Sequence, residues 1–266
     1  MNGRHEIESK LRGESLVRRG LLKRYENIKP VRIAPELNVV KIGGHGLIDY
    51  GAPVVKPLME EIGGLCSRNQ MLVVTGGGAR VRHIMDIGLD LGLPTGVLAE
   101  LAGKISEQNA IMVSVLLSEY GGTRINTSDL LDIPTMLRMG LLPVIQGTPP
   151  YGLYEYPTEA IPQHRTDTGA FIIAEVLGAK SCVLLKNTDG LYTEDPFKNP
   201  EAELIREIRA EELLSMHMED MVLEGKAVEL LLGAKNVREI RIVNGHKRGY
   251  LQRALEGENV GTVIRS

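Results

Sequence analysis

From Leu37 onward, short apolar runs alternate with longer stretches of helical periodicity, and this alternation constrains the fold more than any other feature of the sequence. The expected strands are residues 37–43, 71–75, 142–146, 182–186 and 240–244, and the expected helices are residues 53–66, 81–91, 99–120, 168–177 and 226–235. Strands that alternate with helices form a mainly parallel sheet covered on both faces. We therefore expect a three-layer α/β/α sandwich, with binding sites beyond the carboxyl ends of its strands.

The first 30 residues differ from the rest because they are charged and lack this alternation. Apolar positions within residues 5–25 predict a short amphipathic helix, packed on its own domain or on a neighbouring subunit. The segment does not read as a signal peptide, and no apolar run reaches membrane-spanning length, so we expect a cytoplasmic protein. Residues 1–30 are thus an expected extension, and residues 31–266 an expected domain with lobes at about 31–150 and 151–266. The Pro-rich stretch 147–165 between the lobes fits neither period and predicts a long functional loop.

Charge and cysteine usage narrow the class of protein. The chain has 31 Lys and Arg against 34 Asp and Glu, a formal net charge of -3, which gives no reason to expect nucleic acid as a partner. Cys66 and Cys182 lie in apolar stretches without metal-ligand spacing. We expect both to be reduced thiols in a reducing compartment.

Glycine-rich turns follow the first two expected strands. Lys41 precedes Gly43 and Gly44, and an ammonium group in so apolar a run needs a partner, although a surface lysine beside a turn is the alternative. The second turn contains Gly76, Gly77 and Gly78. Backbone N–H groups freed by glycine, together with a cation and a helix N-terminus, form a typical phosphate site. The pattern is neither a Walker A sequence nor the dinucleotide GxGxxG motif.

Two motifs in the second half could complete such a site. Thr166 or Asp167 could cap the helix that follows, or could act on Mg²⁺ or a transferred phosphoryl group together with Thr168. The segment from Lys186 to Pro196 follows another strand, and its Asp-Gly pair predicts a tight turn. If the turn has a chemical role, Lys186 supplies a cation, and Asp189 and Asp195 supply carboxylates, at the end of a third strand.

These four motifs occur in an order that resembles the amino-acid-kinase family, and within it the uridylate kinases. They are Lys-x-Gly-Gly at 41–44, the glycine triplet, Thr-Asp-Thr-Gly-Ala at 166–170, and Asp-Gly-Leu-Tyr-Thr-x-Asp-Pro at 189–196. Further segments, among them Arg-Val-Arg-His at 80–83, and the N-terminal extension resemble the molybdenum-storage branch of the family. The resemblance implies ATP and Mg²⁺, and subunits assembled around a cavity in which molybdate or tungstate is deposited. A uridylate or other small-molecule kinase that transfers the ATP γ-phosphate is the alternative, and a non-catalytic nucleotide-binding scaffold is a third.

The same resemblance assigns roles to residues. Lys41 would lie against the β- and γ-phosphates, Asp167 would orient Mg²⁺ or the lysines, and Lys226 would be a second cation unless it is simply a solvated helix residue. The nucleotide would be held by Gly43, Gly44, Gly76, Gly77, Gly78, Lys186, Asn187, Asp189, Gly190, Tyr192 and Asp195. The acceptor or oxoanion would contact Arg80, Arg82, His83, Glu107, His164, Thr166 and Thr168.

Some positions depart from the family pattern. Glu107 stands where uridylate kinases place an aspartate for the ribose, and His83 replaces a glycine. The histidines that follow Pro-Pro-Tyr in one type of storage subunit are replaced here by Gly-Leu-Tyr at 152–154. The resemblance further implies a homo-oligomer, a hexamer built as a trimer of dimers, or a hetero-oligomer with a related subunit, with no membrane partner.

Overall fold

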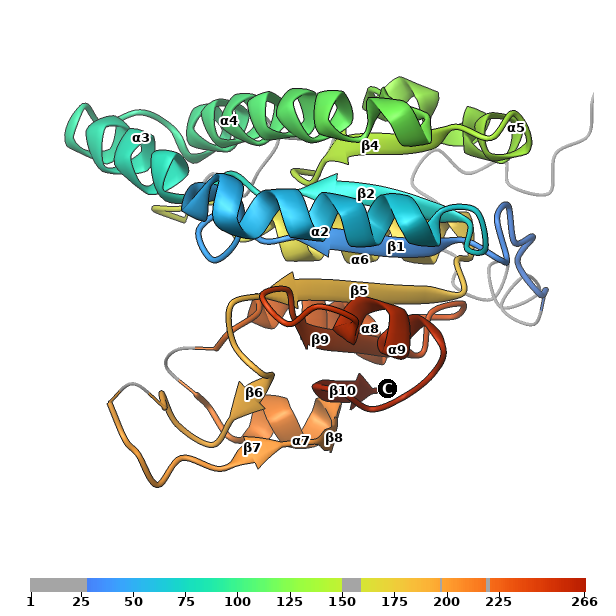
Figure 1. Cartoon of the computed structure of the whole chain (residues 1–266). Helices are drawn as coiled ribbons and strands as arrows, with labels where there is room; N and C mark the ends of the chain where they lie inside the picture. Colours follow the sequence, from blue (N-terminus) through green and yellow to red (C-terminus); the bar gives the residue numbers. More distant parts are fainter. Residues whose placement is uncertain (1–27, 150–158, 197, 219–220) are drawn as a thin grey trace, which may run out of the picture. The chain divides into compact units, whose positions relative to one another are not determined.

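The computed structural model describes residues 28–149, 159–196, 198–218 and 221–266 (Figure 1). The chain divides into two units, Met1–Val31 and Arg32–Ser266. The helix predicted within residues 5–25 and most of the predicted loop at 150–158 lie outside the described residues. The description below concerns the second unit.

Strands and helices alternate through most of this unit. The strands are β1 (Asn38–Ile42), β2 (Met71–Thr75), β3 (Gly122–Arg124), β4 (Leu142–Gln146), β5 (Ser181–Lys186), β6 (Leu191–Tyr192), β7 (Leu204–Ile205), β8 (Glu207–Arg209), β9 (Glu239–Asn244) and β10 (Thr262–Arg265). The α-helices are α2 (Ala52–Leu65), α3 (Ala79–Asp90), α4 (Thr95–Leu116), α5 (Ile133–Arg138), α6 (Thr166–Leu177), α7 (Ala210–Ser215), α8 (Gly225–Leu232) and α9 (Tyr250–Leu255). Short 3-10 segments are η1 (Ile48–Tyr50), η2 (Ser118–Tyr120) and η3 (Thr127–Asp132).

Eight of the described strands form one sheet in the order β3-β4-β2-β1-β5-β9-β10-β8, and β6 pairs with β7 in a separate ribbon. Within the large sheet, the β9–β10 pair is antiparallel and the other pairs are parallel. Ile42 is in register with Thr75, and Thr75 with Gln146, so the carboxyl ends of β1, β2 and β4 lie side by side. The predicted mainly parallel α/β sheet is confirmed.

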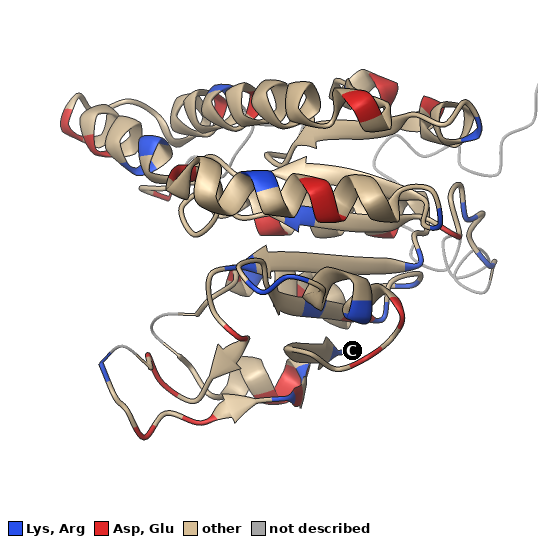
Figure 2. Ribbon diagram, viewed as in Figure 1, with Lys and Arg blue, Asp and Glu red and all other residues tan. Residues whose placement is uncertain are grey.

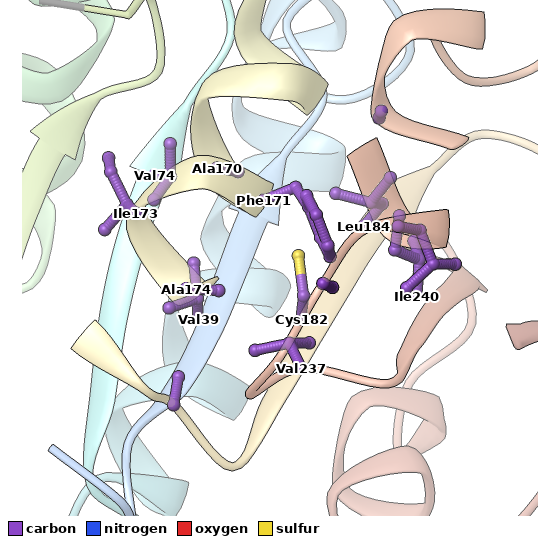
Figure 3. Close-up of a cluster of buried hydrophobic side chains, with 14 of the residues drawn as sticks. Val39, Val74, Ala170, Phe171, Ile173, Ala174, Cys182, Leu184, Val237 and Ile240 are labelled. Carbon is purple, nitrogen blue, oxygen red and sulfur yellow. The ribbon is translucent and has the colours of Figure 1, made fainter. Parts of the chain in front are cut away.

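Side chains of the central strands alternate between two apolar layers. Val39 belongs to a buried cluster that includes residues of α6 and α8, part of which Figure 3 shows around Phe171. Val40 belongs to a second cluster that includes residues of α2, α4 and α9. Because helices cover both faces, the strands are apolar throughout rather than alternating in polarity.

The elements that the sequence pattern missed are short. They are β3, α5, β6, β7, β8, α7, α9 and β10, of two to six residues each. Hydrophobic periodicity needs a longer window than these elements provide. The short β10 in particular runs antiparallel to β9, although α9 lies between the two strands in the chain.

Charged residues are distributed over many elements of the described unit (Figure 2). Lysines and arginines share α2, α3, α4 and α8 with aspartates and glutamates, in keeping with the nearly balanced total charge. Among the described residues, no helix is both long and apolar enough to cross a bilayer.

The two cysteines should differ sharply in reactivity. Cys182 is fully buried in the cluster of Figure 3, and burial, followed by the negative charge of Asp167, raises its pKa to about 12. Cys66 is half-buried, and burial raises the pKa of its thiol as well. Since the thiolate is the reactive form, we expect iodoacetamide at pH 8 to modify Cys66 slowly and to leave Cys182 intact in the native protein. Mass spectrometry of peptides after timed alkylation, with a urea-unfolded sample as control, measures this; rapid native labelling of Cys182 would contradict its burial.

Candidate functional site

A cavity of about 410 Å³ lies at the carboxyl ends of β1, β2 and β5. Its walls include the glycine turns after β1 and β2, the beginning of α6, and Lys186 at the end of β5. Parallel strands bring these segments together although they are far apart in the sequence.

A buried carboxylate between two lysines forms the floor of this cavity. Oδ1 of Asp167 lies 2.7 Å from Nζ of Lys41, and Oδ2 lies 2.7 Å from Nζ of Lys186. Lys41 is 4% exposed and Asp167 3%. Lys41 and Asp167, which were predicted to share one site, form a direct ion pair, and Lys186 is the second cation.

The charges of this cluster shift the pKa values of Asp167 and Lys186. Burial alone would raise the pKa of Asp167, but the ammonium groups of Lys186 and Lys41 outweigh it and hold that pKa well below its usual range. Burial, and then repulsion from Lys41, lowers the pKa of Lys186 against the opposing effect of Asp167. Two cations therefore share one carboxylate in a desolvated place, and the excess positive charge favours an anionic ligand.

The glycine turns bring two stretches of backbone into direct contact. A Cβ atom on Gly44 would lie 2.1 Å from the backbone nitrogen of Gly78, and Gly78 itself has a φ of 79°. A Cβ atom on Gly76 would lie 3.3 Å from Cε of Lys41. A side chain at Gly76 would crowd Lys41, and one at Gly44 would push the two turns apart, so the glycines keep backbone amides available at the cavity.

Buried polar residues of α4 hold the ends of β2 and β4 in place. Ser106 donates its hydroxyl to the carbonyl of Thr75 at 2.5 Å, and Thr75 donates back to the carbonyl of Ser106 at 2.9 Å. The amide of Asn109 donates to the carbonyl of Gly76 at 2.6 Å. Sequence reasoning assigned no role to Ser106. The sequence offered only one indication of a role for Ser106: it is a serine on the apolar side of a predicted helix.

The prediction that Thr166 or Asp167 caps α6 is wrong. The N-cap position is Arg165, whose side chain makes no capping hydrogen bond. Both predicted residues lie inside the first turn, and the carboxylate of Asp167 is turned toward the two lysines instead. The backbone N–H groups of Arg165, Asp167 and Thr168 donate hydrogen bonds to the carboxylate of Glu224. Glu224 directly precedes α8 and is distant from these residues in the sequence.

Many of the candidate site residues line the cavity. Those that do so are Lys41, Gly43, Gly44, Gly76, Gly77, Gly78, Arg82, His164, Thr166, Asp167, Lys186 and Asn187. A neighbouring cavity of about 180 Å³ is lined by Asn187, Gly190, Tyr192 and Asp195, among others. The two cavities share Asn187, Met221 and Val222 as walls. Asp189 stands apart, because its carboxylate accepts hydrogen bonds from Asn244 and Lys247, and the Lys247 ammonium lowers its pKa.

Other candidates do not line the large cavity. Lys226 makes an ion pair of 2.6 Å with Glu229 on its own helix, and Thr168 donates its hydroxyl to Glu224 at 2.7 Å. His83 lies exposed on α3. The structure thus separates Lys226 from the pair of lysines that it was expected to join.

Two charged candidates are bound to neighbouring residues. Arg80 donates to the side chains of Gln108, at 3.0 Å, and Asn109, which ties α3 to α4. Glu107 pairs with Arg124 at 2.9 Å and borders a separate cavity of about 210 Å³. That cavity shares Ala99 and Thr148 with the large one.

The geometry favours one of the two roles considered for Asp167. Both of its oxygens are occupied by ammonium groups, which suits a residue that orients the lysines better than one that binds Mg²⁺ directly. In the described part of the chain, no group of three or more His, Cys, Asp or Glu side chains could hold a metal ion.

Residues 36–244 match the model of the amino acid kinase family. The chain is 38% identical over 265 residues to the molybdenum storage protein subunit beta of Azotobacter vinelandii, covering 99% of this chain and 98% of that protein. It is 30% identical to the uridylate kinase of Thermofilum pendens, covering 86% of this chain and 98% of the kinase.

Solved structures of uridylate kinases share the fold. The uridylate kinase of Archaeoglobus fulgidus superposes with a TM-score of 0.68 at 21% identity, covering 85% of this chain and 99% of the kinase. The UMP kinase of Bacillus anthracis gives a TM-score of 0.68 at 18% identity, covering 87% of this chain and 96% of that structure.

Proposed function

The chain belongs to the amino acid kinase family, and from this premise we propose that it binds ATP with its phosphates in the large cavity and uses ATP to drive the deposition of molybdate or tungstate within an oligomer. The observation that carries the proposal is the buried pair of lysines around Asp167 beside two glycine turns. Each ammonium group has three N–H donors, of which Asp167 takes one, so donors remain for phosphate oxygens.

The charged side chains that line the large cavity suit a negatively charged triphosphate. Besides Lys41 and Lys186, the exposed side chains of Arg82 and Arg165 line it. Asp167 and Glu224 are its acidic residues, and both are already engaged by cations or N–H groups. The adjoining cavity beside Tyr192 offers room for the rest of the nucleotide. Mg²⁺ would be carried mainly on the phosphates, as is usual for this ion.

Molybdate or tungstate as the second substrate is supported by the near full-length identity to a molybdenum storage subunit. Arg82, His164 and Arg165 also line the cavity and supply donors suited to an oxoanion. Assembly is supported by large apolar side chains exposed on two adjacent helices. They are Ile87 and Leu89 on α3 and Ile111, Met112, Val115 and Leu116 on α4.

A uridylate kinase activity is the second candidate. It is favoured by the 210 Å³ cavity beside the large one, which would accommodate an acceptor bigger than an oxoanion. Against it, the carboxylate of Glu107, which borders that cavity, is already paired with Arg124 and also lies near Lys104.

Two assays separate these functions. Purified protein is incubated with Mg²⁺-ATP and molybdate, desalted, and its molybdenum measured by mass spectrometry, with sulfate as the matched oxoanion and ADP as the matched nucleotide. We expect retained molybdenum only with molybdate and ATP together. A parallel incubation with ATP and UMP is analysed for UDP. Formation of UDP without ATP-dependent molybdenum retention would favour the kinase, and failure to bind ATP in calorimetry would reject both.

A further inference from the structure

Glu224 is a buried carboxylate that closes the N-terminus of a helix to which it does not belong. It is 8% exposed and occupies the N-cap position of α8. Its Oε2 accepts hydrogen bonds from the backbone N–H groups of Arg165 and Thr168, at 3.1 and 3.0 Å, and from the hydroxyl of Thr168, at 2.7 Å. Its Oε1 accepts from the N–H of Asp167 at 3.0 Å. One side chain thus satisfies three N–H groups at the beginning of α6.

A helix N-terminus that faces a cavity is normally a place for a ligand's phosphate, because its N–H groups and dipole attract anions. Here the chain's own carboxylate takes that place. The N–H groups of Asp167 and Thr168 are therefore not available to the ligand. What Glu224 fixes instead is the backbone of Asp167, the residue between the two lysines.

The position of Glu224 in the chain gives this contact a second consequence. Met221 and Val222, a few residues earlier, line both the large cavity and the adjoining 180 Å³ cavity. Leu223 between them and Glu224 is buried in the core. The segment 221–224, which borders both cavities, is thus fixed to the backbone of Asp167 by the carboxylate of Glu224.

We propose that Glu224 is a positioning residue: it holds Asp167, and through it Lys41 and Lys186, in the arrangement that binds phosphate. The inference rests on the proposed function, in which that phosphate belongs to ATP. Glu224 also acts by charge. The charged groups near Lys186 are Asp167 on α6, Lys41 on β1 and Glu224 before α8, with Arg82 and Arg165 lining the same cavity. The negative charge of Glu224 raises the pKa of Lys186, against burial and Lys41, which lower it.

The test is Glu224→Gln, which keeps the size of the side chain but replaces one oxygen with an N–H donor and removes the charge. We expect ATP to bind about tenfold more weakly, a loss of about 1.4 kcal/mol. We also expect the loss of ATP affinity at alkaline pH to begin at a lower pH than in the wild type. Without the negative charge of Glu224 the pKa of Lys186 is lower, so Lys186 loses its proton at a lower pH. Glu224→Asp, which retains the charge, should keep the wild-type alkaline limb.

Glu175→Gln is the matched control. The carboxylate of Glu175, which is itself a residue of α6, likewise accepts three backbone N–H groups, those of Lys235, Asn236 and Val237, but it does not line the cavity. The two glutamine variants should lose similar stability in urea unfolding. Only Glu224→Gln should change the affinity for ATP and its pH dependence.

A ligand-free measurement separates failure of this inference from failure of the proposed function. In protein labelled with ¹³C-lysine, the NMR titration of Lys186, assigned with Lys186→Arg, should show a lower pKa in Glu224→Gln than in wild type and in Glu175→Gln. Unchanged titration and unchanged ATP affinity would overturn the positioning role. Wild-type protein that does not bind ATP would reject the proposed function alone. If Glu224→Gln does not fold, Glu224→Asp decides: an affinity and alkaline limb like those of Glu175→Gln support the role of the charge, and a limb shifted to lower pH contradicts it.

Discussion

Replacing Lys41 with methionine is expected to reduce ATP turnover by about 10²- to 10³-fold while the protein remains folded. Lys41 lines the large cavity and is 4% exposed, so its ammonium group is held in place beside the proposed phosphate site. Methionine has a similar length and fills the same space. Asp167 keeps Lys186 as a partner at 2.7 Å, and the repulsion between the two ammonium groups disappears. We therefore expect the free energy of unfolding to change by no more than about 1–2 kcal/mol.

Asp167→Asn should behave in the opposite way. It leaves two buried ammonium groups without a counter-ion, and breaking a buried pair in this manner costs about 3–5 kcal/mol. Urea unfolding and ATP turnover of both variants measure the contrast, with Lys56→Met, at an exposed position of α2, as the control for loss of a lysine. Normal turnover in Lys41→Met would remove the phosphate role from the end of β1.

The parts of the site that sequence predicted are those encoded locally. The bounds of β2 and β4 were predicted to the residue, because a short, mainly apolar run that ends at a glycine has few other interpretations. Glycines at strand ends likewise indicated where backbone would face a ligand. Parallel pairing then brings the ends of β1, β2 and β5 together without further information.

The parts that sequence missed depend on contacts between distant segments. Glu224 precedes an ordinary amphipathic helix, and nothing nearby reveals that it satisfies the first turn of α6, 56 to 59 residues away. Lys226, near the start of the same helix, was expected to be the second cation from its resemblance to the family pattern. Lys186, which ends a strand, has that place instead. Arg80 was read as a ligand for anions, but its fork binds two polar side chains of α4.

Gly44→Ala is expected to have the largest effect of any single methyl group added to the site. The new Cβ would lie 2.1 Å from the backbone nitrogen of Gly78 and 2.6 Å from its Cα. Both obstacles are backbone atoms, so rotation of a side chain cannot relieve the clash, and the two glycine turns must move apart. Overpacking of this kind costs about 1–3 kcal/mol. Because both turns line the cavity beside Lys41, we also expect ATP affinity to decrease by at least tenfold.

Gly64→Ala is the matched control for this substitution. Gly64 lies within α2, where an added Cβ meets no atom within 4 Å, and alanine favours a helix over glycine. This variant should gain about 0.4–1 kcal/mol of stability and bind ATP as the wild type does. Urea unfolding and calorimetric titration with ATP of the two variants compare a methyl group in open space with one between the two turns. Equal ATP affinity in both would mean that the contact between the turns does not shape the phosphate site, and the site would then depend on the buried lysines alone.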